Sequence, residues 1–138
     1  MKRLLVLIAI VSVAAFAGCK DSGPTSGANS FVRPSADIVV KSVRIVGAPE
    51  NSVQFNTIYI VNFTFTNHFG IDFVPKISHF IFEDQDKIRH AGIDSGSTAL
   101  AGAFSNSIET LPKNESRDYT AAFLVSPNTT GLILYDPT

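Results

Sequence analysis

Three histidines are the first residues in this sequence that could do chemistry, because their even spacing raises the question of a metal site. His68, His79 and His90 lie eleven residues apart. On β-strands this spacing has no geometric meaning, and the three residues fall on three different predicted elements. No soft ligand from the folded part could join them, since the only methionine is Met1 and the only cysteine is Cys19. The sequence therefore predicts no metal site and no cofactor.

Acidic and hydroxyl side chains offer two further arrangements. Glu83-Asp84-Gln85-Asp86 has enough carboxylates for a weak Ca²⁺ site, but it lacks the glycine and the terminal glutamate of an EF-hand loop. A solvated hairpin turn explains this segment better. A serine–histidine–aspartate triad could also be drawn, with Ser95 or Ser97, His90 and Asp94 as its members. Because no nucleophile elbow is present, we predict that the protein is not an enzyme and has no catalytic residues.

The single cysteine, Cys19, follows a segment with the parts of a secretory signal. Lys2 and Arg3 supply positive charge, and residues 4–16 form an apolar run interrupted by one serine. This run is short for a transmembrane span, which needs about 20 residues. The sequence Phe16-Ala17-Gly18-Cys19 resembles the bacterial lipobox, with phenylalanine in place of the usual leucine.

The lipobox resemblance implies that residues 1–18 are a signal peptide and that Cys19 is the lipidated first residue of the mature protein. A diacylglycerol on the sulfur and an N-terminal acyl chain such as palmitate would together give stable membrane anchoring. A single-pass anchor is the alternative. Lys20 follows the cysteine, and in enterobacterial sorting an aspartate there favours the inner membrane. We therefore expect a bacterial cell-envelope protein, with the outer membrane favoured over the inner membrane or a Gram-positive plasma membrane.

Composition limits the classes of partner. Removing residues 1–18 leaves 120 residues, enough for one domain. The removed part carries two basic residues and no acidic ones, so the formal charge changes from −1 to −3. Without a basic cluster, nucleic acid is not an expected partner. With one cysteine, no disulfide can form within the chain.

The mature chain divides into a linker and a folded domain. Residues 20–34 are rich in glycine, serine and proline, which predicts a flexible tether with a reach of about 20–25 Å. The composition changes at residues 35–36. We therefore assign residues 19–36 to the lipidated cysteine and linker, and residues 37–138 to the domain.

Alternating apolar residues predict β-strands throughout this domain. In residues 55–66 the apolar side chains on one face are Phe55, Tyr59, Val61, Phe63 and Phe65, and those expected inside a later strand are Tyr119, Ala121, Phe123 and Val125. Further strands are expected at residues 38–46, 77–82, 87–93 and 132–135. No run of ten or more residues shows a helical period. The fold class is all-β, an immunoglobulin-like β-sandwich of about seven strands.

The order of these strands resembles a known family. The segments that carry the resemblance are Tyr59–Asn67, Phe80–Asp84, the turn Leu111–Ser116, Ala122–Pro127 and Leu132–Tyr135. They are similar to the DUF4352 family of extracellular, often lipid-anchored, immunoglobulin-like (telokin-like) domains. The family implies a fold and a place at the cell surface, but no catalytic residue and no common ligand. Asn114 stands where the family usually has glycine, and asparagine tolerates the positive φ that such a turn needs.

Three aromatic residues have no core face on the predicted strands: Phe69, Phe73 and Phe104. We favour their burial under the sandwich. If they are instead exposed together, they form a protein-binding patch. The predicted function is a lipid-anchored envelope lipoprotein whose sandwich is a non-catalytic module for binding an unidentified protein or envelope component. The alternatives are a small-ligand or metal carrier and a structural subunit of a surface or secretion machine.

Overall fold

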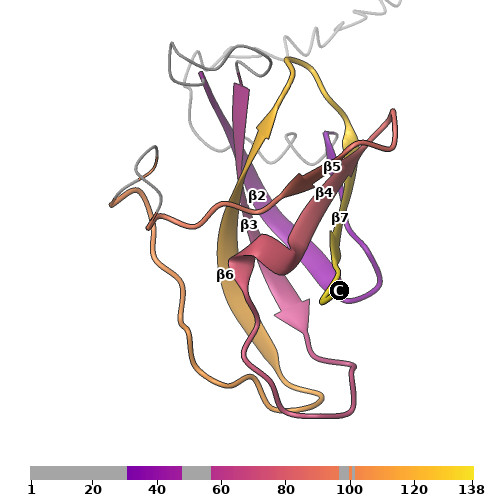
Figure 1. The fold of residues 1–138 in the computed structure, drawn as a ribbon, viewed down its shortest axis with the longest axis vertical. Helices are drawn as coiled ribbons and strands as arrows, with labels where there is room; N and C mark the ends of the chain where they lie inside the picture. Colours follow the sequence, from indigo (N-terminus) through magenta and orange to yellow (C-terminus); the bar gives the residue numbers. More distant parts are fainter. Residues whose placement is uncertain (1–30, 48–56, 97–99, 101) are drawn as a thin grey trace, which may run out of the picture.

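A computed structural model describes residues 31–47, 57–96, 100 and 102–138 (Figure 1). The predicted signal peptide, Cys19 and most of the predicted tether lie outside the described residues, as does Phe55. The described elements are β1 Val32–Arg33, β2 Ile38–Gly47, β3 Thr57–Thr66, the 3-10 helix η2 Ile77–His79, β4 Phe80–Asp84, β5 Arg89–Ala91, β6 Ser116–Val125 and β7 Gly131–Tyr135. No helix in these described ranges is long and apolar enough to cross a bilayer.

The strands form two sheets that pack against each other. One sheet has the order β1-β7-β4-β5, and the other has the order β2-β3-β6. Neighbouring strands are antiparallel except β1 and β7, which are parallel. The predicted β-sandwich of about seven strands is confirmed. Its strand order differs from the ABED and CFG sheets of antibody domains, as it does in many domains that share this architecture.

The long strands β3 and β6 form because every second residue is apolar. In β3 the residues Tyr59, Val61, Phe63 and Phe65 are buried, and in β6 the residues Tyr119, Ala121, Phe123 and Val125 are buried. The antiparallel register places Phe63 opposite Tyr119 and Val61 opposite Ala121. The predicted inward faces of both strands are therefore confirmed for the described residues.

Aromatic side chains connect the two sheets. Phe80 and Phe82 project inward from β4 and are fully buried. The ring of Phe80 lies 4.7 Å from that of Phe63, and the ring of Phe82 lies 5.9 Å from that of Tyr59 and 5.8 Å from that of Phe123. Offset and edge-on contacts at such distances stabilise a core beyond the burial of area alone.

The outer face of β3 is polar only along its second half. Asn62, Thr64 and Thr66 lie there, as the alternation predicts. In the first half, Ile58 and Ile60 are buried in a second, smaller cluster with Leu100 and Ala122. The segment after β5 covers this half of the sheet, where Ile93 forms a bridge with Ala122. The strand is therefore buried on both faces at its beginning, which the sequence pattern did not predict.

Three predicted boundaries differ from the structure. The strand predicted at residues 87–93 is shorter, since β5 spans only Arg89–Ala91. Residues 77–79 form a helical turn rather than the start of a strand, because the His79 N–H donates to the Lys76 carbonyl at 3.0 Å. β1 lies inside residues 19–36, the range predicted as linker. Val32 is fully buried in the core and pairs with Gly131. The folded part therefore begins before Asp37.

Candidate binding site at the tip of the sandwich

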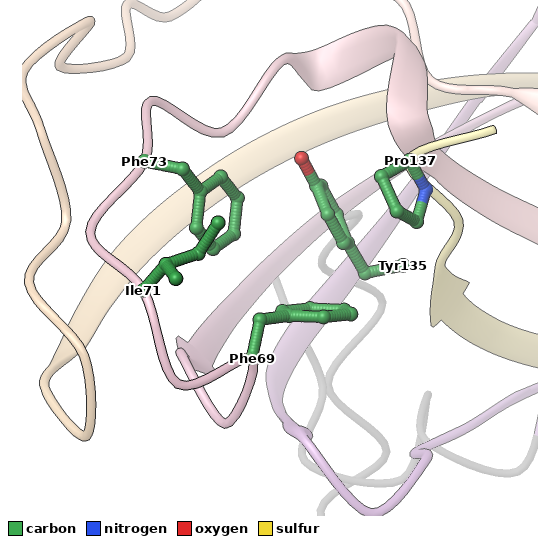
Figure 2. A pocket seen from close by; sticks show the side chains of 5 residues that line it. All are labelled: Phe69, Ile71, Phe73, Tyr135 and Pro137. Carbon is green, nitrogen blue, oxygen red and sulfur yellow. The ribbon is translucent and has the colours of Figure 1, made fainter.

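An apolar pocket of about 200 Å³ lies at the end of the sandwich where β3 leads into the loop of residues 67–76. Figure 2 shows the side chains that line it. They are Phe69, Ile71, Phe73, Tyr135 and Pro137. We call this cavity the tip pocket.

Three aromatic rings build the tip pocket. The ring centroids of Phe69, Phe73 and Tyr135 lie 5.5 to 5.7 Å from one another. Tyr135 also packs against Phe65 at 4.8 Å and Phe80 at 4.9 Å. The aromatic surface is therefore continuous with the core, so its position is fixed by the packing of the sandwich.

The loop that carries Phe69 and Ile71 is held by one buried side chain. Asn67 is fully buried. Its amide nitrogen donates to the carbonyls of Ile71 at 2.7 Å and Leu111 at 3.0 Å, and its amide oxygen accepts the Phe69 N–H at 3.0 Å. A backbone bridge between Phe73 and Leu111 ties the same loop to the segment before β6. These bonds fix the loop in the conformation that forms the pocket.

The opposite wall is held by the neighbours of Pro137. The Asp136 N–H donates to the His79 carbonyl at 2.8 Å, and the Asp136 carboxylate accepts from Arg89 at 2.7 Å. Hydrogen bonds from Thr138 and from Arg89 lower the pKa of Asp136 to about 2. The carboxylate is therefore ionised at neutral pH, and its ion pair with Arg89 persists there.

The pocket offers no hydrogen-bonding group from its own lining side chains. Tyr135 has the only polar side-chain atom among them, and its hydroxyl points away from Phe69 (Figure 2). Burial raises the pKa of Tyr135, against the opposing effect of a hydrogen bond with the backbone of Lys76. The phenol is therefore neutral, and the pocket suits an apolar group.

Four exposed apolar side chains lie at the tip pocket or at a second cavity beside it. Phe69 and Ile71, which line the tip pocket, are 44% and 66% exposed, and Val74 and Ile108, which line the second cavity, are 45% and 81% exposed. We call these four residues the tip patch.

The structure brings together two of the three aromatic residues that the sequence singled out. Phe69 and Phe73 meet at the tip pocket, whereas Phe104 packs on the smaller cluster at the outer face of β3 and β6. Sequence reasoning missed Ile71, Tyr135 and Pro137. The sequence does contain a signal for Tyr135. The apolar run of the last strand stops there, which places this residue at an end of the sheet.

A second, more polar cavity of about 390 Å³ lies beside the tip. It is lined by Val74, Pro75, Lys76, Ile77, Ser78, Gly92, Asp94, Asn106, Ser107 and Ile108. The Asp94 carboxylate accepts from the Asn106 amide at 3.0 Å and from the Ser95 N–H at 2.7 Å. This volume falls in the range of about 300–1,000 Å³ that small-molecule sites occupy.

The predicted solvated turn at Glu83–Asp86 is wrong for one residue, Asp84. Its side chain and that of His90 are each only 7% exposed, and the His90 Nε2 lies 3.0 Å from the Asp84 carboxylate. His68 lies elsewhere, 2.6 Å from Asp37 at the surface. The histidines do not converge, and no three metal-ligating side chains of the described residues form a group that could hold an ion.

Comparisons with protein-family models, curated proteins and solved structures find no significant match to this chain. The resemblance to the DUF4352 family therefore stays a prediction.

Proposed function

We propose that this chain is a lipid-anchored lipoprotein of the bacterial cell envelope, whose β-sandwich is a non-catalytic module for binding another protein or an envelope component. The tip pocket carries this proposal, because it is an apolar cavity in an exposed patch at one end of a well-packed sandwich. Apolar pockets of this kind receive the anchor residues that dominate protein–protein binding.

The sequence supports the anchor. Cys19 follows a basic start, an apolar run and two small residues, and Phe16–Cys19 resembles a lipobox. By the sorting rule, Lys20 favours the outer membrane. Membership of the DUF4352 family would fit the same location, because its domains are extracellular and often lipid-anchored.

A small-ligand carrier is the second candidate, on account of the 390 Å³ cavity. Lys76 and Asp94 give it a cation and a carboxylate, and Ser107 gives it a hydroxyl. A ligand for this cavity would have both polar and apolar parts. A structural subunit of a surface or secretion machine is a further form of the binding hypothesis.

Metabolic labelling with palmitate, followed by membrane fractionation, tests the anchor. We expect Cys19→Ser to remove the label and release the protein from membranes. Gly18→Ala should keep the label and the membrane association, because it keeps a small residue before the cysteine.

Photo-crosslinking tests the binding site. A photo-crosslinking residue at Ile71 should give a discrete protein adduct in the same cells, and one at Ile88 should not. Label that persists in Cys19→Ser contradicts the anchor, and equal adducts at both positions contradict the binding site.

A further inference from the structure

The chemistry of the tip pocket and its position in the fold narrow down its occupant. We infer that it receives one apolar side chain, aliphatic or aromatic, from a partner protein that approaches from the aqueous side. This inference rests on the proposed function and specifies its partner.

The size of the pocket favours a single side chain. Its 200 Å³ is below the roughly 300–1,000 Å³ of small-molecule sites. It is comparable with the cavity of about 150 Å³ that holds one benzene ring. The five lining side chains present apolar surface, and the Tyr135 hydroxyl is directed to the Lys76 backbone instead. A leucine, isoleucine or phenylalanine side chain matches this cavity in volume and polarity.

The topology argues against the protein's own membrane. The Phe31 carbonyl accepts the Gly131 N–H at 2.8 Å, so the described chain enters beside the first residue of β7. Tyr135, the last residue of β7, lines the tip pocket. Four residues of strand separate these ends by about 13 Å. The loop that follows β3 lies beyond the last residues of β7 (Figure 1). A lipid anchor at Cys19 therefore joins the domain at the end away from the pocket.

The segment between the anchor and the domain cannot fill the pocket either. Residues 20–30 read KDSGPTSGANS and contain no large apolar side chain. The apolar lining, the single-side-chain volume and the position away from Phe31 together favour a protein segment on the aqueous side as the occupant.

The loop is already organised for such a partner. Because the Asn67 hydrogen bonds and the Phe73–Leu111 bridge hold it in the free protein, binding does not have to order it. Preorganisation of this kind raises affinity by reducing the entropy lost on binding.

Methyl NMR on the full mature chain in nanodiscs of phosphatidylethanolamine and phosphatidylglycerol tests this inference. The reporters are Ile71 in the tip pocket and Ile88, which is 52% exposed in the turn between β4 and β5. N-acetyl-leucinamide and N-acetyl-phenylalaninamide should shift Ile71 with millimolar affinity and leave Ile88 unchanged. N-acetyl-lysinamide should shift neither residue.

Two matched variants complete the test. Ile71→Glu should weaken binding of both apolar probes at least tenfold, whereas Ile88→Glu should leave it unchanged. Because Ile71 is largely exposed, Ile71→Ala should leave the fold unaltered, and it should also weaken binding of both apolar probes.

Several results would overturn the inference. They are the absence of any shift at tens of millimolar probe, broadening of Ile71 by a paramagnetic lipid headgroup, and shifts at the tip patch that depend on protein concentration alone. The second result would identify lipid as the occupant, and the third would identify a second copy. A chain recovered outside the nanodiscs would contradict the proposed anchor, while its titration would still report on the pocket.

Discussion

Asp84 shows how the surroundings of one residue can differ from its sequence context. It belongs to an acidic stretch, yet its side chain lies inside the sandwich beside His90. Its carboxylate also accepts the N–H groups of Asp86 and Ile88, each at 2.9 Å. Burial raises the pKa of Asp84, but the hydrogen bonds from His90 and from these backbone groups outweigh it, so the pKa lies below its usual value. The ionised carboxylate holds the β4–β5 turn.

The first stability prediction concerns Asp84→Asn. Since the folded-state pKa is lower than the unfolded-state value of about 3.9, the carboxylate stabilises the fold above that pH. This contribution is lost as the pH falls through the folded-state pKa. We expect Asp84→Asn to lower the free energy of unfolding by about 1–3 kcal/mol at pH 7. The difference from wild type should shrink in urea titrations below pH 4.

Asp118→Asn is the matched control, because Asp118 is exposed and paired with Lys41 at 2.6 Å. An exposed pair contributes about 0–1 kcal/mol. If the two substitutions cost the same, Asp84 does not have the role assigned to it.

The conformation of a single residue was predictable from the sequence where the local backbone geometry determines which residue types fit. Asn114 has a φ of +63°, so the expected tolerance of asparagine at this turn is confirmed. The pairing of Asp84 with His90 was not predictable, because it depends on the register that places His90 opposite Phe82. The turn sets that register, because the Lys87 N–H donates to the Asp84 carbonyl and the Asp84 N–H donates to the Ile88 carbonyl, and the sequence does not show which residues close the turn.

At the scale of elements, long alternating strands were predictable and short ones were not. β3 and β6 each have ten residues, enough for their period to be read directly. β1 has two residues, and only its parallel pairing with β7 defines it. The tip pocket was predictable in part, since the loop residues Phe69 and Phe73 stood out while Tyr135 was hidden in a strand. The part of the pocket that Tyr135 and Pro137 form depends on where β7 ends relative to the loop, which is a tertiary feature.

The second prediction concerns the loop of residues 67–76. Asn67→Ala leaves the carbonyls of Ile71 and Leu111 without their side-chain donor. Loss of buried partners costs about 1–3 kcal/mol each in unfavourable cases, so we expect a decrease of about 2–4 kcal/mol in the free energy of unfolding. The released loop should also bind the apolar amide probes more weakly.

Asn62→Ala is the control at the same residue type, because Asn62 is exposed on the outer face of β3. Its side chain donates to Ser42 and accepts from Thr120, but at the exposed surface, so the substitution should lower the free energy of unfolding by only about 1 kcal/mol or less. A tip pocket that binds equally well in Asn67→Ala would show that the loop keeps its conformation without the asparagine.

At the scale of the whole molecule, β7 connects the two ends that matter for the proposed function. Its first residue meets the incoming chain, and its last residue lines the tip pocket. The predicted boundary at residue 37 would leave the chain free up to the start of β2. In the structure Val32 is buried and paired with Gly131, so the chain is already held there. The proposed anchor upstream would therefore connect to the end of the sandwich where β7 begins.

The third prediction tests this pinning by truncation. A chain that begins at Asp37 loses Val32 from the core and the ring of Phe31, which lies 6.1 Å from that of Tyr59. Burying one such side chain contributes about 1.5–3 kcal/mol. We therefore expect a chain of residues 37–138 to be less stable than one of residues 30–138 by about 2–4 kcal/mol in thermal or urea unfolding. Arg33→Ala in the longer chain is the control. Because the Arg33 side chain is exposed, the substitution should lower the free energy of unfolding by about 0.5 kcal/mol or less.

Truncation also leaves the β7 edge unpaired, so the shorter chain should aggregate more readily at equal concentration. Equal stability of the two chains would mean that the domain begins at residue 37 and that its orientation on a tether is unconstrained.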